Sequence, residues 1–192
     1  MENIIAQRFE EHLELVSAVQ KDQALLAKLA VAAELIRTAL ATGHKLLFCG
    51  NGGSAADAQH WAAEFVGRFQ KERRGLPAIA LTVDTSILTA VANDYGYERV
   101  FSRQVEALGQ PGDVLIGVST SGNSGNVVAA VELAKTRGLK TVSLTGCGGG
   151  KLAQLTDVCL AIPCKVTARV QEVHSLMGHI LCELADEDFK RA

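Results

Sequence analysis

Residues 114–144, VLIGVSTSGNSGNVVAAVELAKTRGLKTVSL, decide the fold, because two short apolar runs enclose a serine-rich loop and a helical segment. The runs at 114–118 and 141–144 are typical of strands buried on both faces of a sheet. The helix predicted at 126–136 ends before Gly138, the residue type that commonly follows a helix. Strand, helix and strand in this order predict a right-handed βαβ unit with parallel strands.

The same alternation continues on both sides of this unit. Further strands are predicted at 45–49, 78–81 and 158–162. Helices are predicted at 55–69, 86–92, 98–108 and 170–187, with a turn at 93–96 and a glycine-rich loop at 146–150. Five strands alternating with helices predict a three-layer αβα domain around a five-stranded parallel sheet. In such sheets, ligands bind at the loops that follow the strands.

The first 43 residues are predicted to be helical. Apolar residues recur at steps of three and four from Ile5 to Val19, and the pattern resumes from Leu25 to Leu40 after a break at 21–23. Gly43 then ends the second helix. We expect a single domain, with a helical hairpin at 1–43 and an α/β core at 44–192. An apolar helix face left over from the sheet predicts contact between copies of the chain.

Composition excludes several classes of protein. The chain has 192 residues, 48% of them hydrophobic, and a net charge of −2, which disfavours disorder and a nucleic-acid coat protein. Its five cysteines form no C-x-x-C pair, which favours a reducing compartment, so we expect a cytoplasmic protein. No apolar run reaches the roughly 18 residues of a membrane span, and charges interrupt the N-terminus early, so no signal peptide is expected.

The loop at 119–124, STSGNS, is the most informative motif. Its four hydroxyl groups and the backbone N–H groups of the following helix make a pocket of donors that suits a phosphate dianion. No Lys or Arg lies in the loop, so hydroxyls, amides and the helix dipole would hold the anion. The alternative is an ordinary N-cap with a polar turn.

The segment 49–54, CGNGGS, is a second loop between a strand and a helix. It lacks the spacing and the lysine of a P-loop, and it lacks G-x-G-x-x-G. The pair Gly52-Gly53 would let a ligand approach the backbone, although a tight turn alone explains it equally well. Ser54 is a candidate N-cap for the helix that follows.

Two helices carry candidate ligands or acid–base groups. His60 and Glu64 are four residues apart and share a helix face, although such a pair is more often a surface hydrogen bond. Gln171 and His179 are eight apart on the closing helix and roughly aligned. His179 could equally be a core histidine, and the spacing alone does not point to Gln171, because Gln is an infrequent zinc ligand.

With these motifs in place, the chain resembles the phosphoheptose isomerases, a branch of the sugar-isomerase (SIS) domain family. The resemblance runs nearly end to end. Besides the N-terminal hairpin, it is carried by CGNGGS at 49–54, His60-x-x-x-Glu64, Gly67-Arg68, AND at 92–94, Phe101-Ser102, GDV at 112–114, STSGNS at 119–124, LTG at 144–146, VQE-x-H at 170–174 and His179.

The resemblance implies reversible conversion of sedoheptulose 7-phosphate into D-glycero-D-manno-heptose 7-phosphate through an enediol(ate). This is the first step towards the nucleotide-activated heptose of cell-envelope polysaccharide. It also implies a homotetramer with active sites near subunit contacts. One zinc per subunit would be held by His60, Glu64, Gln171 and His179, and Glu64 and His179 would be the acid–base pair. The implied substrate contacts are Asn51, Gly52, Gly53, Glu64, Asn93, Asp94, Ser119, Thr120, Ser121, Ser124 and Gln171.

One position departs from the family pattern, since Ala168 precedes Arg169 where members often carry an acidic residue. Two other functions were weighed. A non-enzymatic relative binds the bacterial replication initiator as an adaptor, but it would not need a complete acid–base set. An effector-sensing domain of a transcription regulator is disfavoured, because no helix-turn-helix segment and no basic surplus are present. A membrane or nucleic-acid partner is not expected.

Overall fold

The computed structural model describes residues 2–189 and contains one parallel sheet. Its strands, in the order β2-β1-β3-β4-β5, pair in parallel throughout. This confirms the predicted five-stranded parallel sheet. The strand bounds are β1 Leu46–Gly50, β2 Ala78–Ala80, β3 Val114–Ser119, β4 Lys140–Thr145 and β5 Val158–Ala161.

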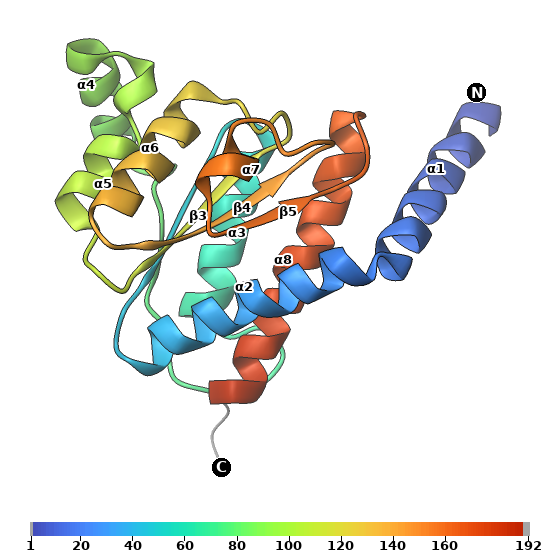
Figure 1. Ribbon diagram of the computed structural model, residues 1–192, viewed down its shortest axis with the longest axis horizontal. Coiled ribbons are helices and arrows are strands. Elements are labelled where there is room, and N and C mark those ends of the chain that lie inside the picture. Colours follow the sequence, from blue (N-terminus) through green and yellow to red (C-terminus); the bar gives the residue numbers. More distant parts are fainter. Residues whose placement is uncertain (1, 190–192) are drawn as a thin grey trace.

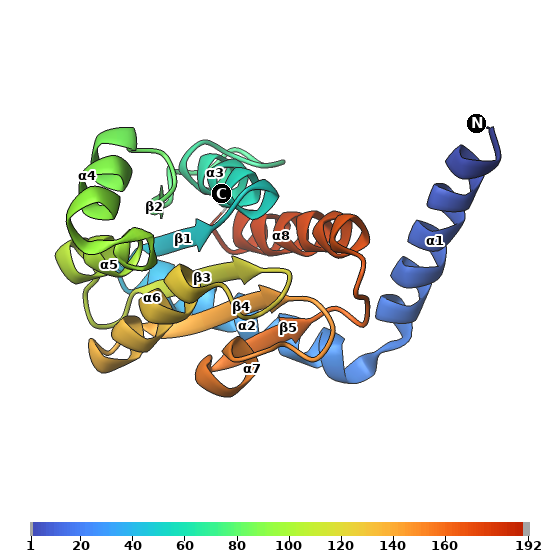
Figure 2. The same cartoon turned by 90° about the horizontal axis from the view of Figure 1, so that it is seen from above.

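Helices cover both faces of the sheet and give the predicted three layers (Figures 1 and 2). One apolar core joins the sheet to α2 (Gln23–Ala41), α3 (Gly53–Val66) and α8 (Thr167–Phe189). The other core joins it to α5 (Ser102–Leu108), α6 (Gly125–Thr136) and α7 (Leu152–Leu155). Side chains of β1 alternate between the two cores, as expected for a strand covered on both faces.

The direction of the chain changes between β1 and β3. From β1 the chain runs to β2 at one edge, and it then returns to the other side of β1 to continue through β3, β4 and β5. The loops after β1 and β3 therefore leave the sheet side by side, at its carboxyl edge. Such a switch point is where doubly wound sheets bind ligands.

Two helices precede the sheet, and the predicted break between them is present. Helix α1 (Glu2–Lys21) ends before Asp22, whose side chain accepts a hydrogen bond from the Leu25 N–H and caps α2. Helix α2 packs on the sheet core, and the last turns of α1 join that core through Leu15 and Val19, whereas the first half of α1 projects from the body (Figure 2). Phe9 and Leu13 are 69% and 66% exposed on α1. The leftover apolar face predicted from the sequence is thus present.

Three local predictions were wrong. Helix α4 (Thr85–Tyr95) runs through the segment expected to be a turn and ends at Gly96, whose φ of +86° suits glycine. The expected helix at 98–108 is a short 3₁₀ turn, η1 (Tyr97–Arg99), followed by α5. Ser54 is not the N-cap of α3. The N-cap is Gly52, with φ +57°, and the helix begins at Gly53, two residues before the predicted start at residue 55. No helix within residues 2–189 is long and apolar enough to cross a membrane.

Candidate active site

The serine loop after β3 gathers its hydroxyl groups around Ser119. The Oγ atom of Ser119 lies 2.9 Å from Oγ of Ser124 and 3.3 Å from Oγ of Ser121. Ser119 is buried, Thr120 and Ser124 are half-buried and Ser121 is exposed. Ser124 is the N-cap residue of α6, but its side chain makes no capping hydrogen bond. The hydroxyl cluster therefore does more than end a helix, and it lies where α6 directs its N-terminal dipole.

The glycine-rich loop at 146–150 supports the serine loop from behind. Gly122 has φ +66°, and a Cβ atom there would lie 2.0 Å from the carbonyl oxygen of Gly149. Leu152 N–H donates to Gly122 C=O at 3.1 Å, and Lys151 N–H donates to Asn123 Oδ1 at 3.0 Å. The packing between the two loops fixes the shape of the serine loop and explains the glycines.

The loop after β1 presents Asn51 next to the serine loop. Its side chain is bonded by Asn126 and by the hydroxyl group of Tyr97, neither of which the sequence singled out. Gly53, two residues later, is covered by the side chain of Gln171, since a Cβ atom on Gly53 would lie 2.6 Å from Gln171 Nε2. The sequence-predicted contacts Asn51, Gly53 and Gln171 thus belong to one region.

A cavity of about 330 Å³ opens at this region between α3 and α8. Asp57 on α3 accepts a hydrogen bond from the Ser175 hydroxyl on α8 at 2.8 Å. Burial raises the pKa of Asp57, against the opposing effects of Ser175, His60 and His179. Sequence reasoning missed this carboxyl group, although it lies one helical turn before His60. The lining residues are Gly53, Asp57, Ala168, Gln171, Glu172 and Ser175.

His60, Glu64 and His179 meet further along the same pair of helices. Nε2 of His60 lies 2.8 Å from Nε2 of His179 and 3.6 Å from Oε1 of Glu64. The ring of Phe69 stacks on His179 with 5.3 Å between centroids. The side chains of His60 and Glu64 are 50% and 26% exposed. His60 therefore lies close to both His179 and Glu64, which are three of the four implied metal ligands, although the three side chains do not form a metal-binding group as they stand.

Gln171 is separate from this cluster within one chain. It lies eight residues before His179 on α8, a rise of about 12 Å along the helix, and it contacts the loop at Gly53. Among residues 2–189, no three His, Cys, Asp or Glu side chains are close enough to hold a metal ion. The two imidazole nitrogens nevertheless converge, and ligands of one tetrahedral zinc would be about 3.3 Å apart. The donor chemistry suits zinc, but one chain supplies only part of a site.

Asn93 and Asp94 lie in the last turn of α4 rather than in a loop. Asn93 Nδ2 donates to Asp94 Oδ1 at 2.8 Å, and both residues are exposed. Helix α4 stands at the β2 edge of the molecule (Figure 1). The structure shows no hydrogen bond between either residue and the two ligand loops, so their substrate role stays a prediction.

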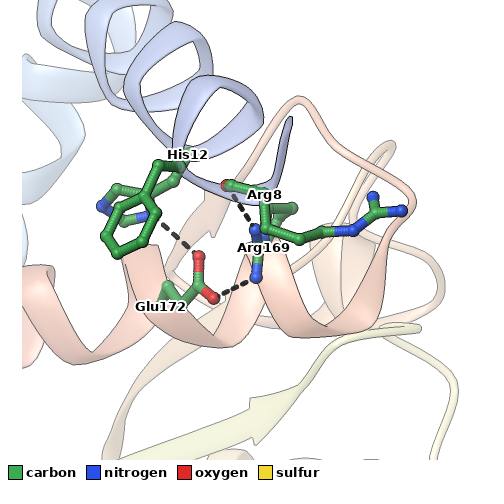
Figure 3. Close-up of a pocket in the computed structure, with 5 residues that line it drawn as sticks. Arg8, His12, Arg169 and Glu172 are labelled. Atoms are coloured by element: carbon green, nitrogen blue, oxygen red, sulfur yellow. Dashed lines mark hydrogen bonds and ion pairs between the residues drawn. The ribbon is translucent and has the colours of Figure 1, made fainter. Parts of the chain in front are cut away.

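A second cavity, of about 310 Å³, lies between α1 and α8 (Figure 3). Glu172 accepts from Arg169, and Nδ1 of His12 lies 2.7 Å from its other oxygen. Arg169 also donates to the carbonyl oxygen of Arg8 at 2.7 Å. These contacts dock α1 on α8. Glu172 lines both cavities. The part of α1 that carries Arg8 and His12 therefore lies next to the region of Gln171.

Known proteins resemble this chain along most of its length. The sequence profile of the SIS domain matches residues 8–146. A phosphoheptose isomerase from Roseiflexus sp. (strain RS-1) is 60% identical over 157 residues, which are 82% of this chain and 79% of that protein. One from Aliarcobacter butzleri (strain RM4018) is 51% identical over 188 residues, 98% of each chain. The structure of phosphoheptose isomerase GmhA from Neisseria gonorrhoeae superposes with a TM-score of 0.91 at 47% identity, covering 97% of this chain and 98% of that one.

Proposed function

Since this chain belongs to the phosphoheptose isomerases of the SIS domain family and is an isomerase, we propose that it interconverts sedoheptulose 7-phosphate and D-glycero-D-manno-heptose 7-phosphate. The product would enter the synthesis of a nucleotide-activated heptose for cell-envelope polysaccharide. The observation that carries the proposal is the hydroxyl cluster of Ser119, Ser121 and Ser124 at the switch point of the sheet. This cluster suits a phosphate group remote from the reacting carbons.

The conversion moves a proton between two carbons of the open-chain sugar. A base removes a proton from C1 of the ketose, and the resulting enediol(ate) takes a proton at C2 to give the aldose. The carboxylate of Glu64 has the right chemistry for this base, and it lies on the helix that begins at the loop of Gly52 and Gly53. The imidazole of His179, held against Phe69, is suited to moving a proton between the sugar oxygens.

We propose one zinc ion per subunit, with His60, Glu64, Gln171 and His179 as ligands. When bound, zinc would polarise the carbonyl group and stabilise charge on the enediolate oxygen. The converging nitrogens of His60 and His179 support this assignment. Because Gln171 and His179 are eight residues apart on one helix, a single ion could contact both only if they came from different copies of the chain.

This separation supports the homotetramer expected from the family resemblance. The apolar residues of α1, such as Phe9 and Leu13, are exposed in the single chain and would be covered by neighbouring copies. The part of α1 that carries Arg8 and His12 lies beside the region of Gln171, so the same contacts would bring subunits together at the active site. All five cysteines are free thiols, which agrees with the cytoplasmic location that we propose.

Incubation of the purified protein with sedoheptulose 7-phosphate tests the proposal directly. We expect an aldose product by reductive trapping or NMR, and deuterium at C2 when the reaction runs in heavy water. Dephosphorylated sedoheptulose is the control and should be a very poor substrate, because it lacks the group that the serine loop holds. Absence of turnover in metal-loaded protein, or equal turnover of both sugars, would contradict the proposal.

A further inference from the structure

Asn51 and Asn126 face each other across the switch point, where the loops after β1 and β3 lie side by side. Asn51 follows β1 directly and is half-buried. Asn126 is the second residue of α6 and only 3% exposed. The two residues are 75 positions apart in the sequence, and their side chains form the direct polar link between the two ligand loops.

Hydrogen bonds fix the orientation of both amides. Asn126 Oδ1 accepts from the backbone N–H of Val127 at 2.9 Å, so its Nδ2 atom must point the other way. That Nδ2 donates to Asn51 Oδ1 at 2.9 Å, and Asn51 Nδ2 donates back to Asn126 Oδ1 at 2.8 Å. Exchanging oxygen and nitrogen in either amide would place donor against donor and acceptor against acceptor. The pair therefore admits one arrangement.

A third group occupies the remaining lone pair of Asn51. The hydroxyl group of Tyr97, from η1, donates to Asn51 Oδ1 at 3.2 Å. The carbonyl oxygen of Asn51 thus has two donors, while its Nδ2 has a second N–H beyond the one given to Asn126. The part of Asn51 left for a ligand is a donor, which suits the oxygen atoms of a sugar phosphate.

We infer that Asn126 is a positioning residue, which holds Asn51 so that it presents an N–H donor, and not its carbonyl oxygen, to the substrate. This inference rests on the proposed function, since the sugar phosphate is the ligand that Asn51 would meet. Asn126 itself is buried behind Asn51 and acts through it.

A double-mutant cycle in kcat/KM for sedoheptulose 7-phosphate tests the dependence on Asn51. Asn51→Ala and Asn126→Ala should each lower kcat/KM on the order of tenfold, mainly through KM, as expected for one misplaced hydrogen bond. The double variant should lie within about twofold of Asn51→Ala, because Asn126 then has nothing to position. If the two losses multiply to about a hundredfold, Asn126 acts independently of Asn51 and the inference is wrong.

Asn126→Asp keeps the fold more securely than the alanine variant. It retains an acceptor for Val127 N–H, and an acidic group in the first turn suits a helix. It loses the donor to Asn51 Oδ1, so we expect a loss in kcat/KM in a protein that still folds, although the buried carboxylate lowers its melting temperature. Gln154→Glu, at an exposed position on α7, is the matched control, because it also replaces an amide by a carboxylate but lies outside both ligand loops. An equal loss in both variants would show a charge effect and overturn the inference.

The side-chain amide signals of Asn51 in ¹⁵N-labelled protein test the pairing without substrate. They should shift in Asn126→Asp and stay in place in Gln154→Glu. Unchanged Asn51 signals in Asn126→Asp would refute the positioning role. This measurement also separates the two proposals: a wild-type protein inactive on sedoheptulose 7-phosphate would defeat the proposed function, while the amide signals would still decide the role of Asn126.

Discussion

Helices α3 and α8 meet at two polar sites, a buried ion pair and the histidine cluster, which differ in how many of their polar atoms have hydrogen-bond partners. Arg73, after α3, and Asp186, on α8, form an ion pair whose side chains are 0% and 1% exposed. Both Asp186 oxygens accept hydrogen bonds, from the Arg73 guanidinium and from the N–H groups of Gln70 and Lys71. The guanidinium also donates to the carbonyl oxygens of Glu64, Phe65, Gly67 and Arg74, at and just beyond the end of α3.

The histidine cluster is the opposite case. His60 is half exposed, its nearest polar partners are His179 and Glu64, and the carboxylate of Glu64 lies 3.6 Å away. A buried charge must be fully paired, because an unpaired one costs several kcal/mol. A reacting group needs hydrogen-bonding or coordination positions that are not already occupied. The backbone carbonyl of Glu64 accepts a hydrogen bond from Arg73 of the buried ion pair, whereas its side chain lies in the histidine cluster. The ion pair therefore holds the end of the helix that carries the proposed base.

Breaking the buried ion pair of Arg73 and Asp186 should have the largest effect on stability. We expect Arg73→Ala to lower the free energy of unfolding by about 3–5 kcal/mol, because it leaves Asp186 buried without its cation and the α3 carbonyl groups without a donor. Chemical denaturation measures this. The matched control is Lys71→Ala, two residues earlier, whose exposed pair with Glu187 is worth less than about 1 kcal/mol. Similar losses in both variants would contradict the larger contribution of the buried ion pair.

Two titratable groups of α8, His174 and Asp186, extend the comparison to the pH dependence of stability. Burial lowers the pKa of His174 to about 4. Because its Nε2 contacts the Thr145 carbonyl, its buried Nδ1 is the unprotonated atom, and this atom has no hydrogen-bond partner among residues 2–189. The unfolded chain protonates His174 near pH 6.5 and the folded chain only near pH 4. The contribution of neutral, buried His174 to the free energy of unfolding is therefore fully present above pH 6.5 and is lost progressively as the pH falls to 4. Up to about 3 kcal/mol is expected.

Denaturation at pH 7, 5.5 and 4.5 measures this loss. His174→Gln removes the titrating group, keeps a donor for the Thr145 carbonyl and should flatten the dependence in that window. Asp186 contributes at lower pH. Burial raises its pKa, but the hydrogen bonds and charge of Lys71, Gln70 and Arg73 outweigh this and lower it. Its contribution is present above its unfolded pKa and is lost as pH falls below about 4. An unchanged slope in His174→Gln would refute the assignment.

Changing the histidine cluster should lower turnover and leave the free energy of unfolding largely unchanged. Glu64→Gln should lower turnover roughly a hundredfold or more, about 2.7 kcal/mol, while sugar-phosphate binding is retained. In heavy water the variant should fail to exchange deuterium into the product. Metal content must be measured on the same sample. Glu72→Gln, on the exposed segment that follows, is the control. If Glu64→Gln keeps its metal and isomerises at nearly the wild-type rate, the base lies elsewhere, and His179 is the first candidate.

Metal loading gives a smaller test of the same cluster. We expect about one zinc ion per subunit by elemental analysis of protein purified without chelator. His60→Ala should lower both metal content and turnover, because it removes one of two converging nitrogens. A fully active protein without metal would remove zinc from the mechanism.

The smallest effect is expected at the phosphate loop. Ser121→Ala should weaken substrate binding by about 1–3 kcal/mol, the cost of one lost hydrogen bond to a charged group. The dissociation constant from calorimetry measures this. Ser86→Ala, on the exposed first turn of α4, is the control and should have no effect. Equal affinities for Ser121→Ala and the wild type would argue against a phosphate at this loop.

The strands and most helices were predictable because their signals are local. Short apolar runs located every strand to within two residues, and the break at Asp22 followed from the interrupted apolar pattern. The segment at 93–96 was misjudged, since Asn, Asp and Gly together favour a turn, yet the helix continues to Gly96. The serine loop was likewise found from local features alone.

What the sequence by itself determined is therefore the three-layer fold and the two loops at the switch point, since both follow from short-range patterns. Tertiary structure decided which distant side chains meet: His60 and His179 are 119 positions apart, Arg73 and Asp186 113, and Asn51 and Asn126 75. No local pattern encodes such meetings, because they depend on how α3, α6 and α8 pack on the sheet. The eight-residue spacing of Gln171 and His179 on one helix already separates them by about two turns, whereas packing decided that Gln171 meets the loop at Gly53.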